Sequence, residues 1–281
     1  MRTIALTAAA LLLVYHLLLA NGFRPAAVTL PDQNLNNRIV VERFAAAAPY
    51  VAVVGSSMSR AIDIHGDCVY KLALAGGSSL TGLAVIATKK VKPRRVYVEI
   101  NVPRNSVQED LVADAGSMLL QVSPAFHAEN MPVNLAYYSV QRFAAKPAPA
   151  IAGDEVFRSN LALQRAIYEK PMAESTLQDN IAKLRGYTAQ LEGAGIEVVL
   201  FELPVHPELE QLPLARQIRA AFRSAFPDNR LLAADYFAAG LAMRTRDGVH
   251  LNSTEARQVL AMFARDWLSI CPRPMKGAAP I

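Results

Sequence analysis

Short apolar runs separated by amphipathic stretches dominate the pattern of hydrophobic and polar positions along the chain. The runs are rich in Val, Ile and Leu and are bounded by Gly, Pro, Asn or Ser, which is typical of buried strands. The expected strands cover residues 50–54, 69–74, 95–100, 196–203 and 230–234.

Helical spacing of apolar residues is clearest over residues 174–192, where Leu177, Ile181 and Leu184 share one face and Gly193 follows as a stop signal. Ser78 is a suitable N-cap for a second helix that reaches about residue 90. Further helices are expected over residues 37–47, 208–226 and 253–269.

Strands that alternate with helices predict a parallel sheet with right-handed crossovers and helices on both faces. We therefore expect an α/β protein, a three-layer α/β/α sandwich with a five-stranded sheet, in one domain over residues 49–281. Residues 105–171 contain several prolines and no clear period, so they are interpreted as an insertion with some helix.

The N-terminus carries an apolar segment of the length of a signal sequence or membrane span. Arg2 is followed by residues 3–20, which are apolar apart from two threonines and His16. We expect an uncleaved signal-anchor within residues 1–22, a connector at 23–48, and the domain in the periplasm or outside the cell. A signal cleaved after Ala20, giving a secreted periplasmic protein, is the alternative.

The cysteines and the charge exclude some classes of site. An extracytoplasmic space permits a disulfide between Cys68 and Cys271, and two free thiols are the open alternative. No Cys/His ligand spacing accompanies them, so we expect no metal. The net charge is +5, but the basic residues are scattered apart from one cluster at 89–95, and no aromatics interleave with them, so nucleic-acid binding is not expected.

The candidate chemistry begins where the first strand ends, at Gly55-Ser56-Ser57. Ligands of parallel α/β sheets bind at the carboxyl ends of the strands, where such a serine is presented. Asp247 and His250 stand three residues apart on a predicted turn. There the carboxylate can orient the imidazole, whose other nitrogen can take a proton from a serine.

Gly76-Gly77 after the second strand and Asn101 after the third complete a series of four blocks. Their order resembles the SGNH (GDSL-type) hydrolase superfamily, over about residues 50–269 apart from most of the insertion. Within it, the chain is most similar to membrane-anchored envelope members, the relatives of the alginate acetylation proteins and of the teichoic acid D-alanyl transfer protein. The resemblance implies a flavodoxin-like sheet.

The resemblance also implies roles for individual residues. Ser57 matches the nucleophile, Asp247 and His250 match its partners, and Ser57, Gly76 (or Gly77) and Asn101 match the oxyanion donors. A donor aimed at the oxyanion is worth about 3–4 kcal/mol to the transition state.

Ser56 stands where the hydrolases usually have Asp, and the envelope relatives often have Ser or Thr there. Lys71 stands near the place of an Asn that steadies the loop in relatives, and residues 98–103 lack the Gly-x-Asn-Asp form of the third block. The Gly-x-Ser-x-Gly elbow is absent, which argues against the α/β-hydrolase fold. His206, between two prolines after the fourth strand, is expected either to contact substrate or to be a loop residue.

These features predict serine-dependent acyl-ester chemistry without a cofactor, by an O-acetyl esterase or O-acyltransferase of an envelope or secreted polysaccharide. The expected substrate is an acylated carbohydrate or a small acyl ester, and the expected partners are an inner membrane, through the N-terminal segment, and proteins of an envelope complex. The alternative is a non-catalytic binding protein of a polysaccharide assembly or export machine. The presence of Ser57, Asp247 and His250 together argues against that alternative.

Overall fold

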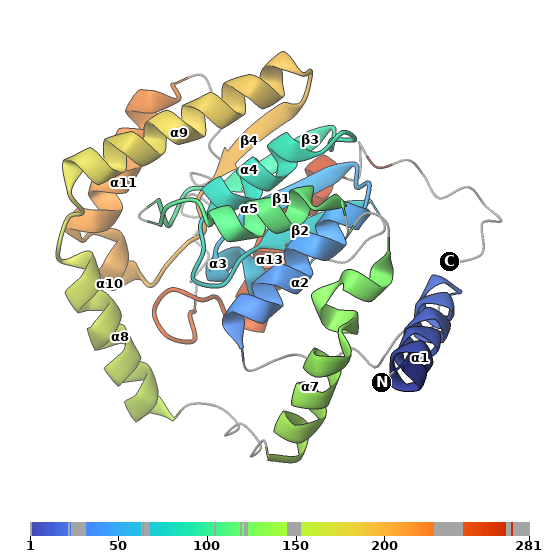
Figure 1. The fold of residues 1–281 in the computed structure, drawn as a ribbon. Coiled ribbons are helices and arrows are strands. Elements are labelled where there is room, and N and C mark those ends of the chain that lie inside the picture. Colours follow the sequence, from blue (N-terminus) through green and yellow to red (C-terminus); the bar gives the residue numbers. More distant parts are fainter. Residues whose placement is uncertain are drawn as a thin grey trace.

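A parallel β-sheet forms the centre of the computed structural model, which describes residues 2–21, 23, 32–62, 64, 68–103, 105–118, 120, 123–144, 153–227, 244–267 and 271. Over these residues the sheet has four strands in the order β2-β1-β3-β4 (Figure 1). The strands are β1 (Val51–Gly55), β2 (Val69–Ala73), β3 (Arg95–Glu99) and β4 (Glu197–Phe201). The α/β class and the parallel pairing are as predicted, whereas the strand expected at 230–234 lies outside the described residues.

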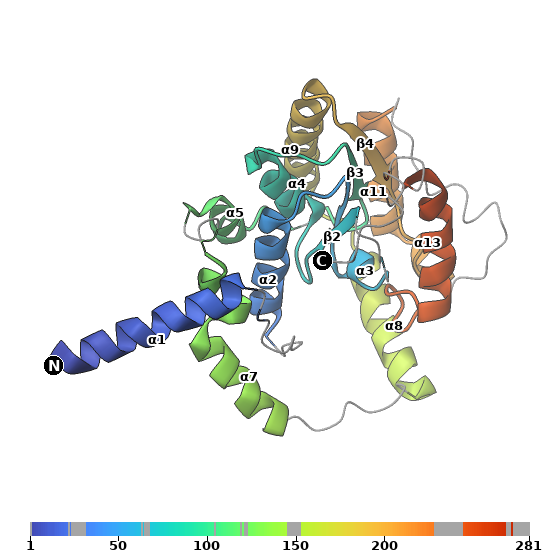
Figure 2. The ribbon, with the colours of Figure 1, turned by 90° about the vertical axis from the view of Figure 1, so that its right-hand side faces the viewer.

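Helices lie on both sides of the sheet, with α2, α4 and α9 on one side and α11 and α13 on the other (Figure 2). The helices are α1 (Arg2–Ala20), α2 (Gln33–Ala46), α3 (Ser57–Arg60), α4 (Ser79–Thr88), α5 (Glu109–Gly116), α7 (Pro132–Ala144), α8 (Asp154–Tyr168), α9 (Glu174–Gly193), α10 (Pro207–Glu210), α11 (Pro213–Ala225) and α13 (Ser253–Trp267), with 3₁₀ turns η1 (Pro124–Phe126) and η2 (Ala128–Asn130).

Strand β1 is buried along its whole length, which explains why its residues are uniformly apolar instead of alternating with polar ones. Val54 pairs with Leu72 on one side and with Val98 on the other, so apolar layers continue across the sheet. Gly82 lets α4 approach closely, because a Cβ at this position would lie 2.9 Å from Val54.

Two helices differ from their predicted bounds for identifiable local reasons. The helix expected over 208–226 is two helices, α10 and α11, because Pro213 begins a new helix at its first turn. Helix α2 begins at Gln33, four residues before the expected start, because the Asp32 side chain caps it by accepting from the Leu35 N–H at 3.0 Å.

The expected insertion at 105–171 contains α5, η1, η2, α7 and α8 in its described part. Helix α5 packs against α2 and α4. Helix α8 packs against α10 and α11 and lies at the lower left of Figure 1, whereas α7 lies below the sheet near the centre.

Helix α1 projects from the rest of the chain and exposes much apolar surface (Figure 2). Its last turns contact the segment around η1 and η2: Tyr15 Oη donates to the Asn130 carbonyl at 2.7 Å, and His16 Nδ1 pairs with Ser123 Oγ at 2.5 Å. Within the described part of the chain, no helix combines the length and the apolar character needed to cross a membrane.

Cys68 and Cys271 form a disulfide with their Cα atoms 5.8 Å apart. The structure therefore has the disulfide that the sequence left open, and not two free thiols. The bond ties the start of β2 to the segment that follows α13.

Candidate active site

Ser57 is the first residue of α3, and one residue, Ser56, separates it from the end of β1. Ser56 is the N-cap, with extended backbone, and its Oγ accepts from the Met58 N–H at 3.2 Å. A Cβ at Gly55 would overlap Ser59 and the Glu99 carboxylate, so only glycine fits before the turn. The sequence Gly-Ser-Ser therefore specifies a sharp strand-to-helix turn that presents Ser57 at the edge of the sheet.

Glu99, the last residue of β3, organises this turn from the neighbouring strand. Glu99 is only 2% exposed, and its carboxylate accepts four hydrogen bonds from two serines. Ser56 donates its N–H at 2.9 Å and its Oγ at 2.6 Å, and Ser59 donates its N–H at 3.1 Å and its Oγ at 2.5 Å. Sequence reasoning missed Glu99, although an acidic residue at the end of an apolar strand was a usable signal.

Asp247 holds His250 by its side chain and its backbone. Asp247 Oδ2 is 2.7 Å from His250 Nδ1, and Oδ1 accepts the N–H groups of His250 at 2.9 Å and Val249 at 3.2 Å. Burial alone would raise the pKa of Asp247, but these hydrogen bonds outweigh it and lower the pKa from 3.8 to about 2. Asp247 is therefore ionised at neutral pH and favours the tautomer of His250 with its proton on Nδ1.

The turn that carries this pair is fixed at Gly248, whose φ of 100° lies in the left-handed region. The Gly248 N–H donates to Thr245 Oγ1 at 3.1 Å, and its carbonyl accepts the His206 N–H at 2.8 Å. The His206 ring caps α10 and packs edge-on against Phe157, and it is not among the residues that line the pocket. A substrate contact by His206 stays a prediction.

His250 Nε2 lies 2.9 Å from Ser57 Oγ, although the two residues are 193 positions apart in the chain. With the proton of the ring on Nδ1, the serine hydroxyl donates to Nε2. The predicted contacts from Ser57 to His250 and from His250 to Asp247 are thus both present. This is the arrangement that allows an imidazole to act as a general base toward a serine.

Ser57 and Gly76 both line the pocket, and in the described structure neither of their backbone N–H groups donates a hydrogen bond. The Gly77 N–H is already donated to the Leu74 carbonyl at 3.0 Å. This distinguishes the two glycines, because only the Gly76 donor is open to a ligand.

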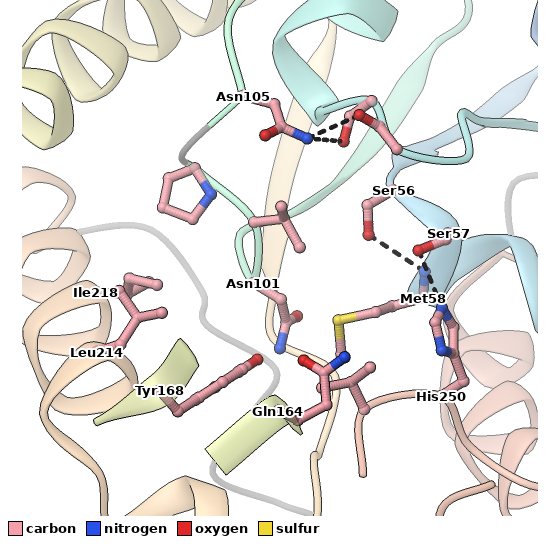
Figure 3. A pocket seen from close by; sticks show the side chains of 15 residues that line it. Ser56, Ser57, Met58, Asn101, Asn105, Gln164, Tyr168, Leu214, Ile218 and His250 are labelled. Atoms are coloured by element: carbon pink, nitrogen blue, oxygen red, sulfur yellow. Dashed lines mark hydrogen bonds between the residues drawn. The ribbon is translucent and has the colours of Figure 1, made fainter. Parts of the chain in front are cut away.

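The Gly76 turn is clamped from α2 and from the segment before α5. The Ala75 carbonyl accepts from Gln33 Nε2 at 2.6 Å and from Asn37 Nδ2 at 2.8 Å, while Asn37 Oδ1 accepts the Ala75 N–H at 2.9 Å. Asn105 Nδ2 donates to the carbonyls of Gly76 at 2.8 Å and of Gly77 at 3.3 Å (Figure 3). Gly76 has a φ of 64°, and a Cβ there would overlap the Gln33 amide, so glycine is required.

Asn101 follows β3 and lies in the middle of the pocket wall (Figure 3). Its side chain pairs with the backbone of Leu203, donating through Nδ2 to the carbonyl and accepting the N–H through Oδ1, both at 2.7 Å. A carboxamide nitrogen has two hydrogens, so one N–H of Asn101 remains for a ligand.

Lys71, which departs from the Asn of the resembled pattern, holds the other end of α3. Its Nζ donates to the carbonyls of Arg60 at 3.0 Å and Ile62 at 2.5 Å, at the C-terminus of this short helix. A long cationic side chain from β2 thereby satisfies backbone carbonyls that the helix leaves open.

The pocket beside Ser57 is a cavity of about 150 Å³. Figure 3 shows Ser57 and His250 at one end and Leu214 and Ile218 at the other. The lining residues are Ser56, Ser57, Met58, Gly76, Gly77, Asn101, Val102, Pro103, Asn105, Gln164, Tyr168, Leu214, Ile218, Val249 and His250.

Among the described residues, no group of three or more His, Cys, Asp or Glu side chains is arranged to hold a metal ion. Comparison with known proteins gives no match to a family model and no significant match to a curated protein. The chemical interpretation therefore depends on the geometry of this site.

Proposed function

We propose that the protein is an SGNH-type serine esterase or O-acyltransferase that acts on O-acyl groups, such as O-acetyl, of an envelope or secreted polysaccharide. The observation that carries the proposal is the hydrogen-bonded chain from Ser57 Oγ through His250 to Asp247, which opens into a pocket with free N–H donors. No cofactor is needed for this chemistry.

In the proposed reaction, His250 Nε2 takes the Ser57 proton while Oγ attacks the ester carbonyl carbon. The N–H groups of Ser57 and Gly76 and the open N–H of Asn101 hold the oxyanion. When the intermediate collapses, the alcohol leaves with the proton from His250 and the acyl group stays on Ser57. Water or a sugar hydroxyl then gives up a proton to His250 and attacks the acyl-serine, which restores the free enzyme.

The strand order β2-β1-β3-β4 is consistent with a flavodoxin-like sheet, which supports the proposed superfamily. In this proposal, residues 230–234 supply the fifth strand of the three-layer sandwich.

We place the domain on the extracytoplasmic side of the inner membrane, where the substrate would be found. The disulfide between Cys68 and Cys271 supports an oxidising compartment. The contacts of Tyr15 and His16 with residues 123–130 support retention of the N-terminal segment as a signal-anchor over a cleaved, secreted form. Partners in an envelope complex are part of the same proposal.

Hydrolysis of p-nitrophenyl acetate by the full chain in detergent tests the enzymatic proposal. Ser57→Ala should abolish turnover, whereas Ser106→Ala, the same change at an exposed serine outside the pocket, should leave it intact. Equal rates for wild type and Ser57→Ala would instead favour a non-catalytic binding protein. Acetylated oligosaccharide detected by mass spectrometry, after supplying an acyl donor and candidate glycans, would identify a transferase.

A further inference from the structure

The two ends of the cavity differ in chemistry. One end holds Ser57 and His250, and the other holds Leu214 and Ile218 of α11 (Figure 3). Both of these aliphatic side chains are buried and belong to the hydrophobic core. Asn101 lies between the two ends, and Tyr168 of α8 adds its ring beside the aliphatic pair.

The roles of the catalytic groups decide which part of an ester lies at each end. His250 Nε2 must reach the oxygen of the leaving alcohol to protonate it, so the alcohol lies on the His250 side. The carbonyl oxygen points to the donors of Ser57, Gly76 and Asn101. The remaining substituent of the carbonyl carbon is the acyl chain, which is directed away from His250 toward Leu214 and Ile218.

The apolar end also fits an alkyl chain better than a sugar. Hydroxyl groups buried against aliphatic side chains lose their hydrogen bonds to water without replacement, which disfavours a sugar ring there. The cavity as a whole has a volume of about 150 Å³, which is about the size of a cavity that holds benzene, so it has room for an acyl group larger than acetyl.

We propose that Leu214, Ile218 and Tyr168 form an acyl subsite for a chain of about four to six carbons. This inference rests on the proposed function and narrows its acyl group from acetyl to a longer chain. Each buried methylene is worth roughly fourfold in binding, so two additional methylenes give about 15-fold.

The test measures kcat/KM of the full chain for p-nitrophenyl acetate, butyrate, hexanoate and octanoate. The expected result is a preference for butyrate or hexanoate of about tenfold or more over acetate. Leu214→Trp fills the apolar end and should shift the preference to acetate, whereas Leu163→Trp, on the exposed face of α8, should not. Ile218→Ala enlarges the same end and should shift the optimum toward octanoate.

Ser57-dependent turnover with acetate equal to or better than the longer esters would overturn the subsite and leave the proposed function standing. The subsite would also be overturned if Leu214→Trp and Ile218→Ala, shown to be folded by thermal melting, kept the chain-length profile of the wild type. Absence of Ser57-dependent turnover for every ester would overturn the proposed function and the subsite together.

Discussion

At the scale of single residues, Glu99 connects the nucleophile turn to the neighbouring strand. The turn after β1 contains four donors that end on this one carboxylate, two from Ser56 and two from Ser59. Ser57 lies between these two serines, so the turn holds it in place without using its N–H, and its Oγ pairs with His250. A carboxylate from β3 thus contacts Ser56, the position at which the resembled pattern usually has Asp.

Glu99→Gln should lower kcat about 10- to 100-fold while KM changes little, because small misplacements of a nucleophile are costly and substrate contacts remain. Glu99 acts through Ser57 as a positioning residue, and the separate measurement of kcat and KM checks this. Ser59→Ala, which removes one donor and keeps the carboxylate, should have the smaller effect. Equal kcat for Glu99→Gln and wild type would contradict the positioning role.

The lowered pKa of Asp247 predicts that the free energy of unfolding falls at acidic pH. Its pKa is lowered to about 2 in the folded protein, so its ionised form stabilises the fold above the ordinary pKa of 3.8. That contribution is lost as the pH falls from about 4 to about 2. Denaturant unfolding at pH 5 and pH 2.5 should show a smaller loss of stability for Asp247→Asn than for wild type.

The same Asp247→Asn variant should lose roughly 10⁴-fold in kcat at neutral pH, because Asn no longer orients the imidazole with its proton on Nδ1. Ester hydrolysis at pH 7 measures this effect. Near-wild-type turnover by a folded Asp247→Asn protein would show that His250 needs no partner.

At the scale of elements, helix α2 positions the Gly76 turn. Asn37 is buried and exchanges two hydrogen bonds with Ala75, so the helix fixes the peptide that precedes the open N–H of Gly76. Residues between the N-terminal segment and the first strand therefore contribute to the site as well as linking two regions.

Asn37→Ala should reduce the free energy of unfolding by about 1–3 kcal/mol, because it leaves the Ala75 N–H without its partner and removes one of the two donors to the Ala75 carbonyl. It should also lower kcat by loosening the Gly76 donor. Denaturant titration and ester hydrolysis check the two effects. Asn34→Ala, at an exposed position of the same helix, is the matched control and should behave like wild type.

Elements with strong local signals were predictable from the sequence, and those set by tertiary contacts were not. The apolar run of β1 and the glycine that follows it place Ser57 correctly, and α9 has the face predicted by Leu177, Ile181 and Leu184. The choice between Gly76 and Gly77 depends on where the Gly77 N–H goes, which only the folded turn reveals.

The remaining parts of the site come from pairings over long stretches of sequence. Glu99 lies at the end of β3, and its role depends on donors that follow the neighbouring strand β1. Leu214 reaches the pocket from a helix about 150 residues after Ser57 in the sequence. No local periodicity encodes such neighbours, because a parallel sheet brings together segments joined by long crossovers.

At the scale of the whole molecule, the disulfide closes a large loop. Cys68 and Cys271 are 203 residues apart, so the bond restricts nearly the whole domain in the unfolded state. A cross-link of this kind typically stabilises a protein by about 2–5 kcal/mol.

The double variant Cys68→Ser/Cys271→Ser should therefore unfold at lower denaturant concentration than wild type, with stability reduced by about 2–5 kcal/mol. Dithiothreitol should lower the midpoint of the wild type and leave that of the double variant unchanged. Equal midpoints for the two oxidised proteins would show that the bond adds no stability.

The central claim is that Ser57 is a nucleophile activated by His250, and covalent labelling tests it most directly. A fluorophosphonate probe should modify the full chain at Ser57, as located by mass spectrometry of peptides, and His250→Ala should lose the label while remaining folded. Absence of labelling at Ser57 in the wild type, or equal labelling of wild type and His250→Ala, would contradict the account.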